Sequence, residues 1–300
     1  MLADSPFRSA AATDTGLLRD HNEDRYWIDP AGEVFLVVDG VGGHAAGELA
    51  AQTAVEAIRE SVAAGGLAAE KRVRAAIAAA NNRIFEMAAL DESRKGMACV
   101  LTLAVVEDGQ ITVGHVGDSR MYLIWNGAIR KLTSDHSPVG QDEDAGELTE
   151  EQAMRHPRRN EVYRDVGTQP RHAEDADFIE IRKCRFHRDA AILLCSDGLT
   201  DDLSSSRVRE IVERYDGDAE RVAGELVEAA NGAGGRDNIT ALFVAGPDFR
   251  GRSGVTRPRG STTRFRPSRG ALTGRAAFLV YGLLLGMLMW AALHMVRMKS

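Results

Sequence analysis

The order in which strand and helix patterns follow one another restricts this chain to a small set of folds. Residues 34–38 form a continuous apolar run rich in β-branched side chains, which is typical of a strand buried on both faces. Residues 69–90 instead repeat apolar side chains at steps of four and three, which indicates a helix with one apolar face. Along the chain, strands are followed by two helices, several strands, two helices and a last strand. This is not the regular alternation of a doubly wound parallel sheet.

The pattern predicts an α+β fold, with a central antiparallel β-sandwich flanked by helix pairs. Two turn signals support antiparallel pairing, because Asp108-Gly109 and Asn126-Gly127 favour tight hairpins. Strands are expected at residues 7–16, 26–28, 34–38, 98–106, 111–116, 121–125, 178–181, 191–195 and 239–244. Helices are expected at residues 44–62, 69–90, 149–155, 204–214 and 218–230, with residues 134–176 otherwise irregular.

The charged residues divide the chain into two parts. Residues 1–248 contain all 44 acidic residues and 27 of the 37 Lys and Arg residues, so they carry a net charge of −17. Residues 249–300 contain the other ten basic residues and no acidic residue. The acidic body is long enough for a large globular domain with its own core, and the basic remainder needs a separate explanation.

The basic remainder contains a candidate membrane anchor. Residues 249–275 are rich in Arg and Gly and show no apolar period, which predicts a flexible linker. Residues 276–296 are 21 residues without Asp, Glu, Lys or Arg, and a helix of this length spans about 30 Å, the thickness of a bilayer core. We expect a transmembrane helix here and a short tail at residues 297–300. A buried core helix or a partner-binding helix is the alternative.

Positive charge predicts the orientation of this segment. Eight Arg residues precede it in the linker, and only Arg297 and Lys299 follow it. The positive-inside rule then puts the N-terminal body in the cytoplasm, on a single-pass protein of the inner (cytoplasmic) membrane. The Arg run could instead bind nucleic acid, but it has few aromatic residues and adjoins the apolar segment. Contact with anionic membrane lipids is therefore favoured, and no nucleic-acid partner is expected.

Aspartates stand at the ends of several expected strands. Asp39 and Asp197 each follow an apolar run, Asp237 lies just before the last strand, and Asp24 adjoins a short apolar run. One such aspartate is usually a turn residue. Several carboxylates that converged on rigid strand ends would repel one another, so together they indicate a bound cation. Their oxygen atoms suit Mg²⁺ or Mn²⁺. The sequence has no C-x-x-C pair of cysteines, so a zinc site is not indicated.

Paired divalent cations indicate phosphate chemistry. Two such ions a few Å apart can activate a water for in-line attack on phosphorus. Arg19, five residues before Asp24, has the guanidinium group that would hold a phosphate. A Ser-His-Asp hydrolase is disfavoured, because neither Ser119 nor Ser196 has a suitable histidine context.

Six short segments carry a resemblance to a known family. They are residues 19–24 (Arg-Asp-His-Asn-Glu-Asp), 38–44 (Val-Asp-Gly-Val-Gly-Gly-His) with 47–48 (Gly-Glu), 116–120 (Val-Gly-Asp-Ser-Arg), 132–137 (Leu-Thr-Ser-Asp-His-Ser), 195–199 (Cys-Ser-Asp-Gly-Leu) and 235–240 (Gly-Arg-Asp-Asn-Ile-Thr). In this order they resemble the PP2C-type (PPM) metal-dependent serine/threonine protein phosphatases in their bacterial form, over about residues 7–246. The resemblance implies a β-sandwich with the metals in a cleft at one end.

The resemblance also assigns roles to individual residues. It implies two Mn²⁺ or Mg²⁺ ions bridged by Asp39, and a weaker third site that involves Asp118 and Asp197. The implied metal-site residues are Glu23 (through water), Asp24, Asp39, Gly40 (through its carbonyl), Asp118, Asp197 and Asp237. Arg19 would bind the substrate phosphate. His44 would protonate the leaving oxygen as a general acid, although it also suits helix capping or a structural hydrogen bond.

The implied function is hydrolysis of phosphoserine and phosphothreonine in proteins. Phosphorylated proteins are then the substrates, and a serine/threonine kinase is the expected opposing partner. A non-catalytic binding module that kept the fold and a phosphatase for small molecules are the alternatives. Loss of a metal-binding aspartate would favour the binding module, but Asp24, Asp39 and Asp237 are all present, as is Asp197.

Overall fold

The computed structural model describes residues 7–42 and 45–252 of the 300-residue chain. Its strands are β1 (Arg8–Asp14), β2 (Arg25–Ile28), β3 (Val34–Val41), β4 (Ala98–Glu107), β5 (Gln110–Val116), β6 (Arg120–Trp125), β7 (Ala128–Lys131), β8 (Glu180–Arg185), β9 (Ala191–Cys195) and β10 (Ile239–Ala245). Its helices are α1 (Ala45–Ala63), α2 (Ala69–Ala89), the 3₁₀ turn η1 (Glu92–Arg94), α3 (Pro138–Asp144), α4 (Glu150–Met154), α5 (Asp197–Thr200), α6 (Ser205–Val212) and α7 (Ala219–Ala233).

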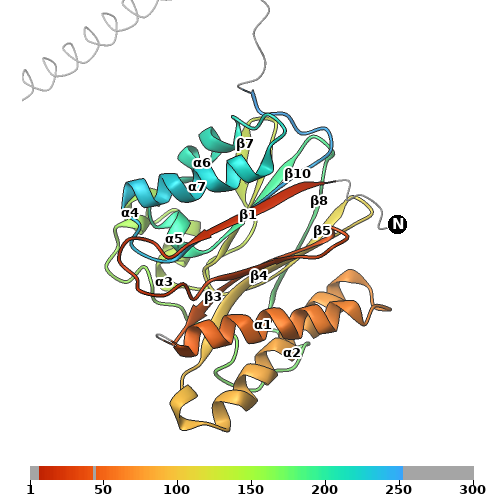
Figure 1. The fold of residues 1–300 in the computed structure, drawn as a ribbon, viewed down its shortest axis with the longest axis vertical. Helices are drawn as coiled ribbons and strands as arrows, with labels where there is room; N and C mark the ends of the chain where they lie inside the picture. Colours follow the sequence, from red (N-terminus) through yellow and green to blue (C-terminus); the bar gives the residue numbers. More distant parts are fainter. Residues whose placement is uncertain (1–6, 43–44, 253–300) are drawn as a thin grey trace, which may run out of the picture. The chain divides into compact units, whose positions relative to one another are not determined.

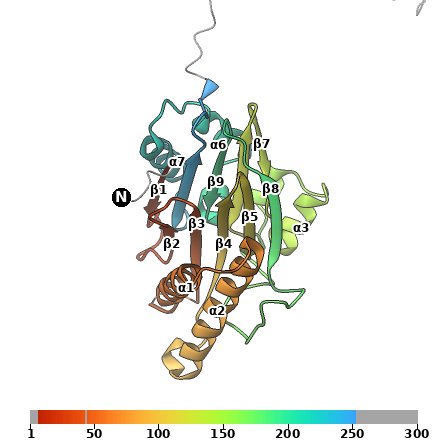
Figure 2. The ribbon, with the colours of Figure 1, turned by 90° about the vertical axis from the view of Figure 1, so that its right-hand side faces the viewer.

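The ten strands form two five-stranded sheets in which every neighbouring pair is antiparallel. One sheet has the order β1-β10-β9-β6-β7 and the other has the order β2-β3-β4-β5-β8. The sheets stack face to face, with α1 and α2 beside the second sheet and α6 and α7 beside the first (Figure 1). A view at right angles shows the long α1 and α2 next to β3, β4 and β5 (Figure 2). The predicted α+β sandwich is confirmed.

Three apolar layers hold this arrangement together. The outer layers lie between each sheet and its helices, and the central layer lies between the sheets. β3 belongs to two of them, because Leu36 and Val38 face the helices while Phe35 and Val37 face the other sheet. A strand with both faces buried reads as a continuous apolar run, which is why residues 34–38 were recognisable.

Residues 178–185 differ from the expectation. The strand predicted at residues 178–181 is wrong in its position, because β8 runs over Glu180–Arg185. Phe178 and Ile179 are buried but precede the strand. β8 is an edge strand that pairs only with β5 and carries mostly polar, exposed side chains, so it leaves no apolar run in the sequence.

The segment after β7 is more helical than expected. Its short predicted helix is confirmed as α4, where Thr149 and Gln152 form a reciprocal capping box. α3 was missed, because only Val139 and Gly140 of its seven residues are buried and no apolar period results. Its local signal is the pair Ser137-Pro138, in which the Ser137 side chain accepts a hydrogen bond from the Gly140 N–H at 3.0 Å.

The folded domain continues beyond residue 248, where the sequence suggested a boundary. Phe249 is 5% exposed and packs against the rings of Tyr215 and Phe243. The Gly251 N–H then donates to the Tyr215 carbonyl at 3.1 Å. The predicted transmembrane segment at residues 276–296 and nearly all of the predicted linker lie outside the described residues. No helix in the described part of the chain is long and apolar enough to cross a membrane.

Candidate metal centre

The strand connections bring the five predicted aspartates to one end of the sandwich. Asp24 directly precedes β2 and Asp39 lies near the end of β3. Because these strands are antiparallel neighbours, the two aspartates lie at the same end of the pair. Asp197 follows β9 and Asp237 precedes β10, which are likewise antiparallel neighbours. Asp118 lies in the short link between β5 and β6. Aspartates that are up to 213 residues apart in the sequence therefore form one cluster.

The carboxylates of this cluster destabilise one another's charged forms. Removal from water raises the pKa of Asp39 well above its usual value, and the charges of the other four aspartates raise it further. The pKa of Asp197 is raised in the same way, by burial and then by the charge of Asp118. Burial also raises the pKa of Asp118 to about 7. Such a cluster is unfavourable at neutral pH unless a cation compensates it.

Asp24 has one satisfied and one unsatisfied oxygen atom. Its Oδ2 accepts a hydrogen bond of 2.6 Å from the Ser196 hydroxyl. Its Oδ1 is buried and has no hydrogen-bond partner among the described residues. Burial raises the pKa of this carboxyl to about 7, although the Ser196 hydrogen bond opposes the shift. A buried carboxylate oxygen without a partner is costly, so it marks a place where a cation fits.

Glycines let two further oxygen ligands approach the cluster. A Cβ atom at Gly47, in the first turn of α1, would lie 1.9 Å from Glu23 Oε2 and 3.0 Å from the Gly40 carbonyl oxygen. Only a residue without a side chain leaves room for both oxygens. Glu23 and the Gly40 carbonyl are thus brought close together by the start of α1.

The donor set fits hard divalent cations. It consists of carboxylate and carbonyl oxygens, burial raises the pKa values of Asp39 and Asp197, and one oxygen of Asp24 has no partner among the described residues. Oxygen ligands of this kind are those that Mg²⁺ and Mn²⁺ prefer. The aspartates predicted from sequence to bind metal therefore lie at the same end of the sandwich, where bound divalent cations would relieve the repulsion between their charges.

Arg19 stands at the open edge of the cluster. Its guanidinium Nη2 donates to Asp237 Oδ2 at 2.6 Å, and half of its side chain is exposed. Arg25 is directed elsewhere, to Glu48 and to backbone carbonyls. An incoming anion at the cluster would therefore meet the exposed Arg19 guanidinium.

Asn238 fixes the loop that carries Arg19, and the sequence interpretation gave it no role. Its buried amide nitrogen donates to the Thr15 carbonyl at 2.9 Å and to the His21 carbonyl at 2.8 Å. Its amide oxygen accepts from the Glu23 N–H at 2.8 Å. The single side chain of Asn238, which is next to Asp237 in the sequence, thus holds the backbone at both ends of this loop. The only local signal was an asparagine placed between that aspartate and the last strand.

A small cavity adjoins Asp118 on the side of α3 and α4. Its volume is about 30 Å³, and its lining includes Asp118, Asp197 and Asp201. Asp201 was also missed in the sequence; it is buried and pairs with Arg159 at 2.7 Å. Asp118 and Asp197, the residues predicted for a third metal, thus line the same cavity.

A buried ion cluster ties α3 to the strands beside Asp118. The Arg120 guanidinium donates to both oxygens of Asp135 and, at 2.7 Å, to Glu143 of α3. Lys131 lies 2.8 Å from Asp144 and completes the cluster. Arg120 thereby couples the Asp118 loop to the first helix of the segment that covers it.

His115, His136 and Glu180 form a second group whose geometry could hold a metal ion. The ring nitrogens of the two histidines, however, already take part in hydrogen bonds. His115 contacts Thr102 and the Gly117 carbonyl at 2.9 Å each, and His136 Nδ1 accepts from the Gly117 N–H at 3.0 Å. Burial lowers the pKa of His136 to about 3, so it is neutral. The group orders the backbone just before Asp118.

His44, the predicted general acid, lies outside the described residues.

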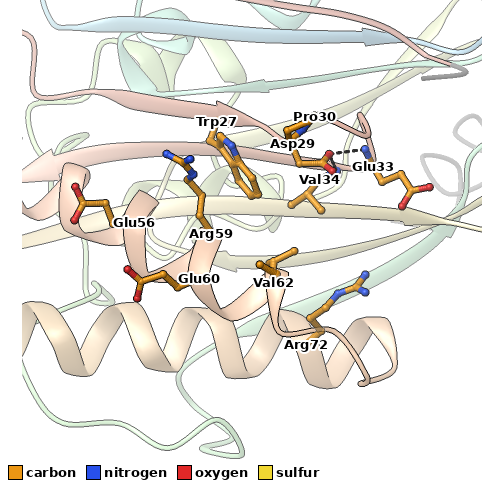
Figure 3. Close-up of a pocket in the computed structure, with 11 residues that line it drawn as sticks. Trp27, Asp29, Pro30, Glu33, Val34, Glu56, Arg59, Glu60, Val62 and Arg72 are labelled. Carbon is orange, nitrogen blue, oxygen red and sulfur yellow. Dashed lines mark hydrogen bonds between the residues drawn. The ribbon is translucent and has the colours of Figure 1, made fainter. Parts of the chain in front are cut away.

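A separate pocket of about 650 Å³ lies beside α1 and the turn between β2 and β3, with Arg59 over the ring of Trp27 (Figure 3). Asp29 and Val34 of this pocket stand at the opposite ends of β2 and β3 from Asp24 and Asp39. The pocket therefore belongs to the other end of the sandwich.

Comparison with known proteins gives a consistent answer. The family described as "Protein phosphatase 2C" matches residues 13–230. The chain is 35% identical over 242 residues to the serine/threonine phosphatase stp of Listeria monocytogenes, covering 77% of this chain and 93% of that protein. It is 33% identical over 240 residues to the protein phosphatase PhpP of Streptococcus pneumoniae, covering 78% and 95% of the two chains.

Solved structures agree in fold. The catalytic domain of the serine/threonine protein phosphatase PstP, solved in complex with two manganese ions, superposes with a TM-score of 0.70 at 29% identity. The match covers 80% of this chain and 97% of that one.

Proposed function

The chain belongs to the protein phosphatase 2C family, and we propose that its aspartate cluster serves the metal-dependent hydrolysis of phosphoserine and phosphothreonine in proteins. It is a protein serine/threonine phosphatase that depends on Mn²⁺ or Mg²⁺. The observation that carries the proposal is the convergence of five aspartates on one site, where burial raises the pKa values of Asp24, Asp39, Asp118 and Asp197 and a buried oxygen of Asp24 is left unpaired among the described residues.

Each side chain has a defined task in this proposal. Asp39, Asp197 and Asp237, with Asp24 and the Gly40 carbonyl, would hold two cations, and Asp118 with Asp197 would hold a third. Bound divalent cations supply positive charge that compensates the carboxylates and makes water more acidic. Arg19 turns its exposed guanidinium to the substrate phosphate and orients it. Glu23 would hold a metal-bound water. His44 donates a proton to the leaving serine or threonine oxygen.

Phosphate release from a phosphothreonine peptide tests the proposal. We expect the purified full-length chain to release phosphate with Mn²⁺ and to lose this activity with EDTA. The Asp39→Asn variant should be inactive with Mn²⁺ while its unfolding transition without metal is retained. A wild-type chain that releases no phosphate from any phosphopeptide, or an Asp39→Asn variant with full activity, would contradict the proposal.

We also propose that residues 276–296 anchor the enzyme at the cytoplasmic face of a membrane. This proposal is supported by the uncharged residues 276–296 and by the eight Arg residues before them. We expect the full-length chain in the membrane fraction of cells and a chain without residues 276–296 in the supernatant. Full-length protein found only in the supernatant would contradict the anchor without affecting the enzymatic proposal.

A serine/threonine kinase that produces the substrates is the proposed opposing partner. Deletion of the phosphatase should raise the phosphorylation of proteins at serine and threonine. A phosphoproteome unchanged by the deletion would argue against this role.

A further inference from the structure

Two adjacent leucines are exposed next to the phosphate-binding arginine. Leu17 is 66% exposed and Leu18 is 72% exposed, and Arg19 follows directly. Single exposed leucines are common on protein surfaces, so their exposure alone indicates nothing. What sets this pair apart is its position at the metal centre and the way its backbone is held.

The loop that carries the leucines is fixed at several points. The Leu17 N–H donates to the Gly235 carbonyl at 2.7 Å, and the Gly16 N–H donates to Asp14 Oδ1 at 2.8 Å. The amide of Asn238 holds the carbonyls on either side of the pair, at Thr15 and His21. The leucines are therefore displayed on an ordered backbone, and their exposure does not result from a loose loop.

Gly16 shows how closely the loop is seated. Its backbone has φ +80°, and a Cβ atom there would lie 2.2 Å from the carbonyl oxygen of Asp237. The loop thus packs directly on the residue that Arg19 contacts. A substrate whose phosphate reaches Arg19 therefore comes close to the two exposed leucines that immediately precede it.

A third exposed apolar side chain lies near a cluster aspartate in the sequence. Val41, two residues after Asp39, is 41% exposed. Covering exposed apolar surface of this kind with an apolar partner lowers the free energy, because the surface is removed from water. The occupant that the position favours is the segment of substrate next to the phosphorylated residue.

We infer that Leu17 and Leu18 form a contact surface for the substrate polypeptide, and that this surface selects an apolar side chain beside the phosphorylated serine or threonine. The inference rests on the proposed protein phosphatase function. It names a determinant of substrate choice, since the leucines contact the peptide and not the phosphate.

A peptide series with a double-mutant cycle tests the inference. Phosphothreonine peptides carry either Leu or Ser at each of the three positions on both sides of the phosphorylated residue. We expect kcat/KM of the full-length wild-type chain with Mn²⁺ to be about tenfold higher for Leu at one of these positions, which equals about 1.4 kcal/mol. In Leu18→Ser this preference should fall to near one, and in Leu18→Met it should persist.

Leu90→Ser is the matched control. Leu90 is 85% exposed, caps the end of α2, and is not part of the cluster. Leu90→Ser should keep the wild-type preference. The inference is overturned if the wild type prefers Leu at no position, or if Leu18→Ser and Leu17→Ser both keep the preference. It is also overturned if the wild type is a dimer that Leu18→Ser dissociates, because a second copy then occupies the surface. A chain inactive on every peptide and on p-nitrophenyl phosphate instead contradicts the proposed function.

Discussion

The side-chain amide of Asn238 holds the backbone of Glu23: the Glu23 N–H donates to Asn238 Oδ1 at 2.8 Å. The same amide binds the Thr15 and His21 carbonyls. One asparagine at the start of β10 thus positions both Glu23 and the loop that carries Arg19, although neither lies near it in the sequence.

Asn238→Ala should therefore impair catalysis more than a comparable loss elsewhere. Three backbone groups lose their partner, so we expect the free energy of unfolding to fall by at least about 2 kcal/mol. Misplacement of Arg19 should lower kcat/KM about 10–100-fold. Denaturant unfolding and peptide dephosphorylation measure the two effects. The control is Asn82→Ala. The Asn82 side chain makes two hydrogen bonds to the Arg171 backbone, of 2.9 and 3.0 Å, and it is not part of the aspartate cluster. Equal kcat/KM losses in both variants would argue against the positioning role.

Gly47→Ala should weaken metal binding while leaving the fold intact. The new Cβ would displace the Glu23 carboxylate, a flexible group that can move aside, and would crowd the Gly40 carbonyl. We expect Mn²⁺ affinity, measured by calorimetry, to fall about tenfold, which is about 1.4 kcal/mol. Gly224→Ala is the control in α7, where nothing lies within 4 Å of the new Cβ. It should raise the free energy of unfolding by about 0.5–1 kcal/mol and leave Mn²⁺ affinity unchanged. Wild-type affinity in Gly47→Ala would contradict the assignment of Gly40 and Glu23.

Without metal, the protein should become less stable as the pH rises above about 6.5. The pKa values of Asp24 and Asp118 are about 7 in the folded state, and that of Asp39 is well above its usual value. The folded state therefore binds more protons than the unfolded state, and its stability falls as pH rises through these pKa values. His115 and His136, whose pKa values are lowered, act in the opposite sense only below about 6.5.

Urea unfolding at pH 6.5 and pH 8.5 checks this expectation. The midpoint should be lower at pH 8.5 in EDTA, and saturating Mn²⁺ should remove or reverse the difference because it binds the charged carboxylates. Asp118→Asn should reduce the pH dependence in EDTA. A midpoint in EDTA that does not fall between these two pH values would contradict the raised pKa values.

Arg120→Met should destabilise the whole domain. It leaves Asp135 as a buried charge without its bidentate partner, and breaking one side of a buried ion pair costs about 3–5 kcal/mol. Urea unfolding measures the change. Arg158→Met is the control, because Arg158 makes a similar two-oxygen contact with Glu161 on the exposed surface. That variant should leave the unfolding midpoint almost unchanged. Similar midpoints for the two variants would show that the Arg120 cluster is not a structural anchor.

The folded domain should include residues 249–252, which lie beyond Asp248. Truncation after Asp248 removes Phe249, whose burial against Tyr215 and Phe243 contributes about 1.5–3 kcal/mol. A chain ending at Arg252 retains this contact and the Gly251 hydrogen bond to Tyr215. We expect the longer chain to melt several degrees higher in calorimetry. Identical melting temperatures would mean that Phe249 does not belong to the folded unit.

The sequence alone was sufficient for the fold class and for where the aspartates would gather. Strands buried on both faces, such as β3, leave apolar runs, and an aspartate at the end of such a run is visible without a structure. The apolar period of α2 and the turn at Asn126-Gly127, whose φ angles are 52° and 71°, are equally local signals. An edge strand such as β8 buries too little to leave one, which explains why its position was wrong.

The tertiary structure decided everything that depends on residues far apart in the chain. Asn238 acts on a loop more than 200 residues earlier, and the unpartnered Oδ1 of Asp24 is known only once the surroundings of that atom are defined. The exposure of Leu17 and Leu18 likewise contradicts what two adjacent leucines suggest in a sequence. Hydrophobic patterns are short-range because they follow the period of a helix or strand, whereas hydrogen-bond partners, burial and pKa values depend on which surfaces the fold brings together.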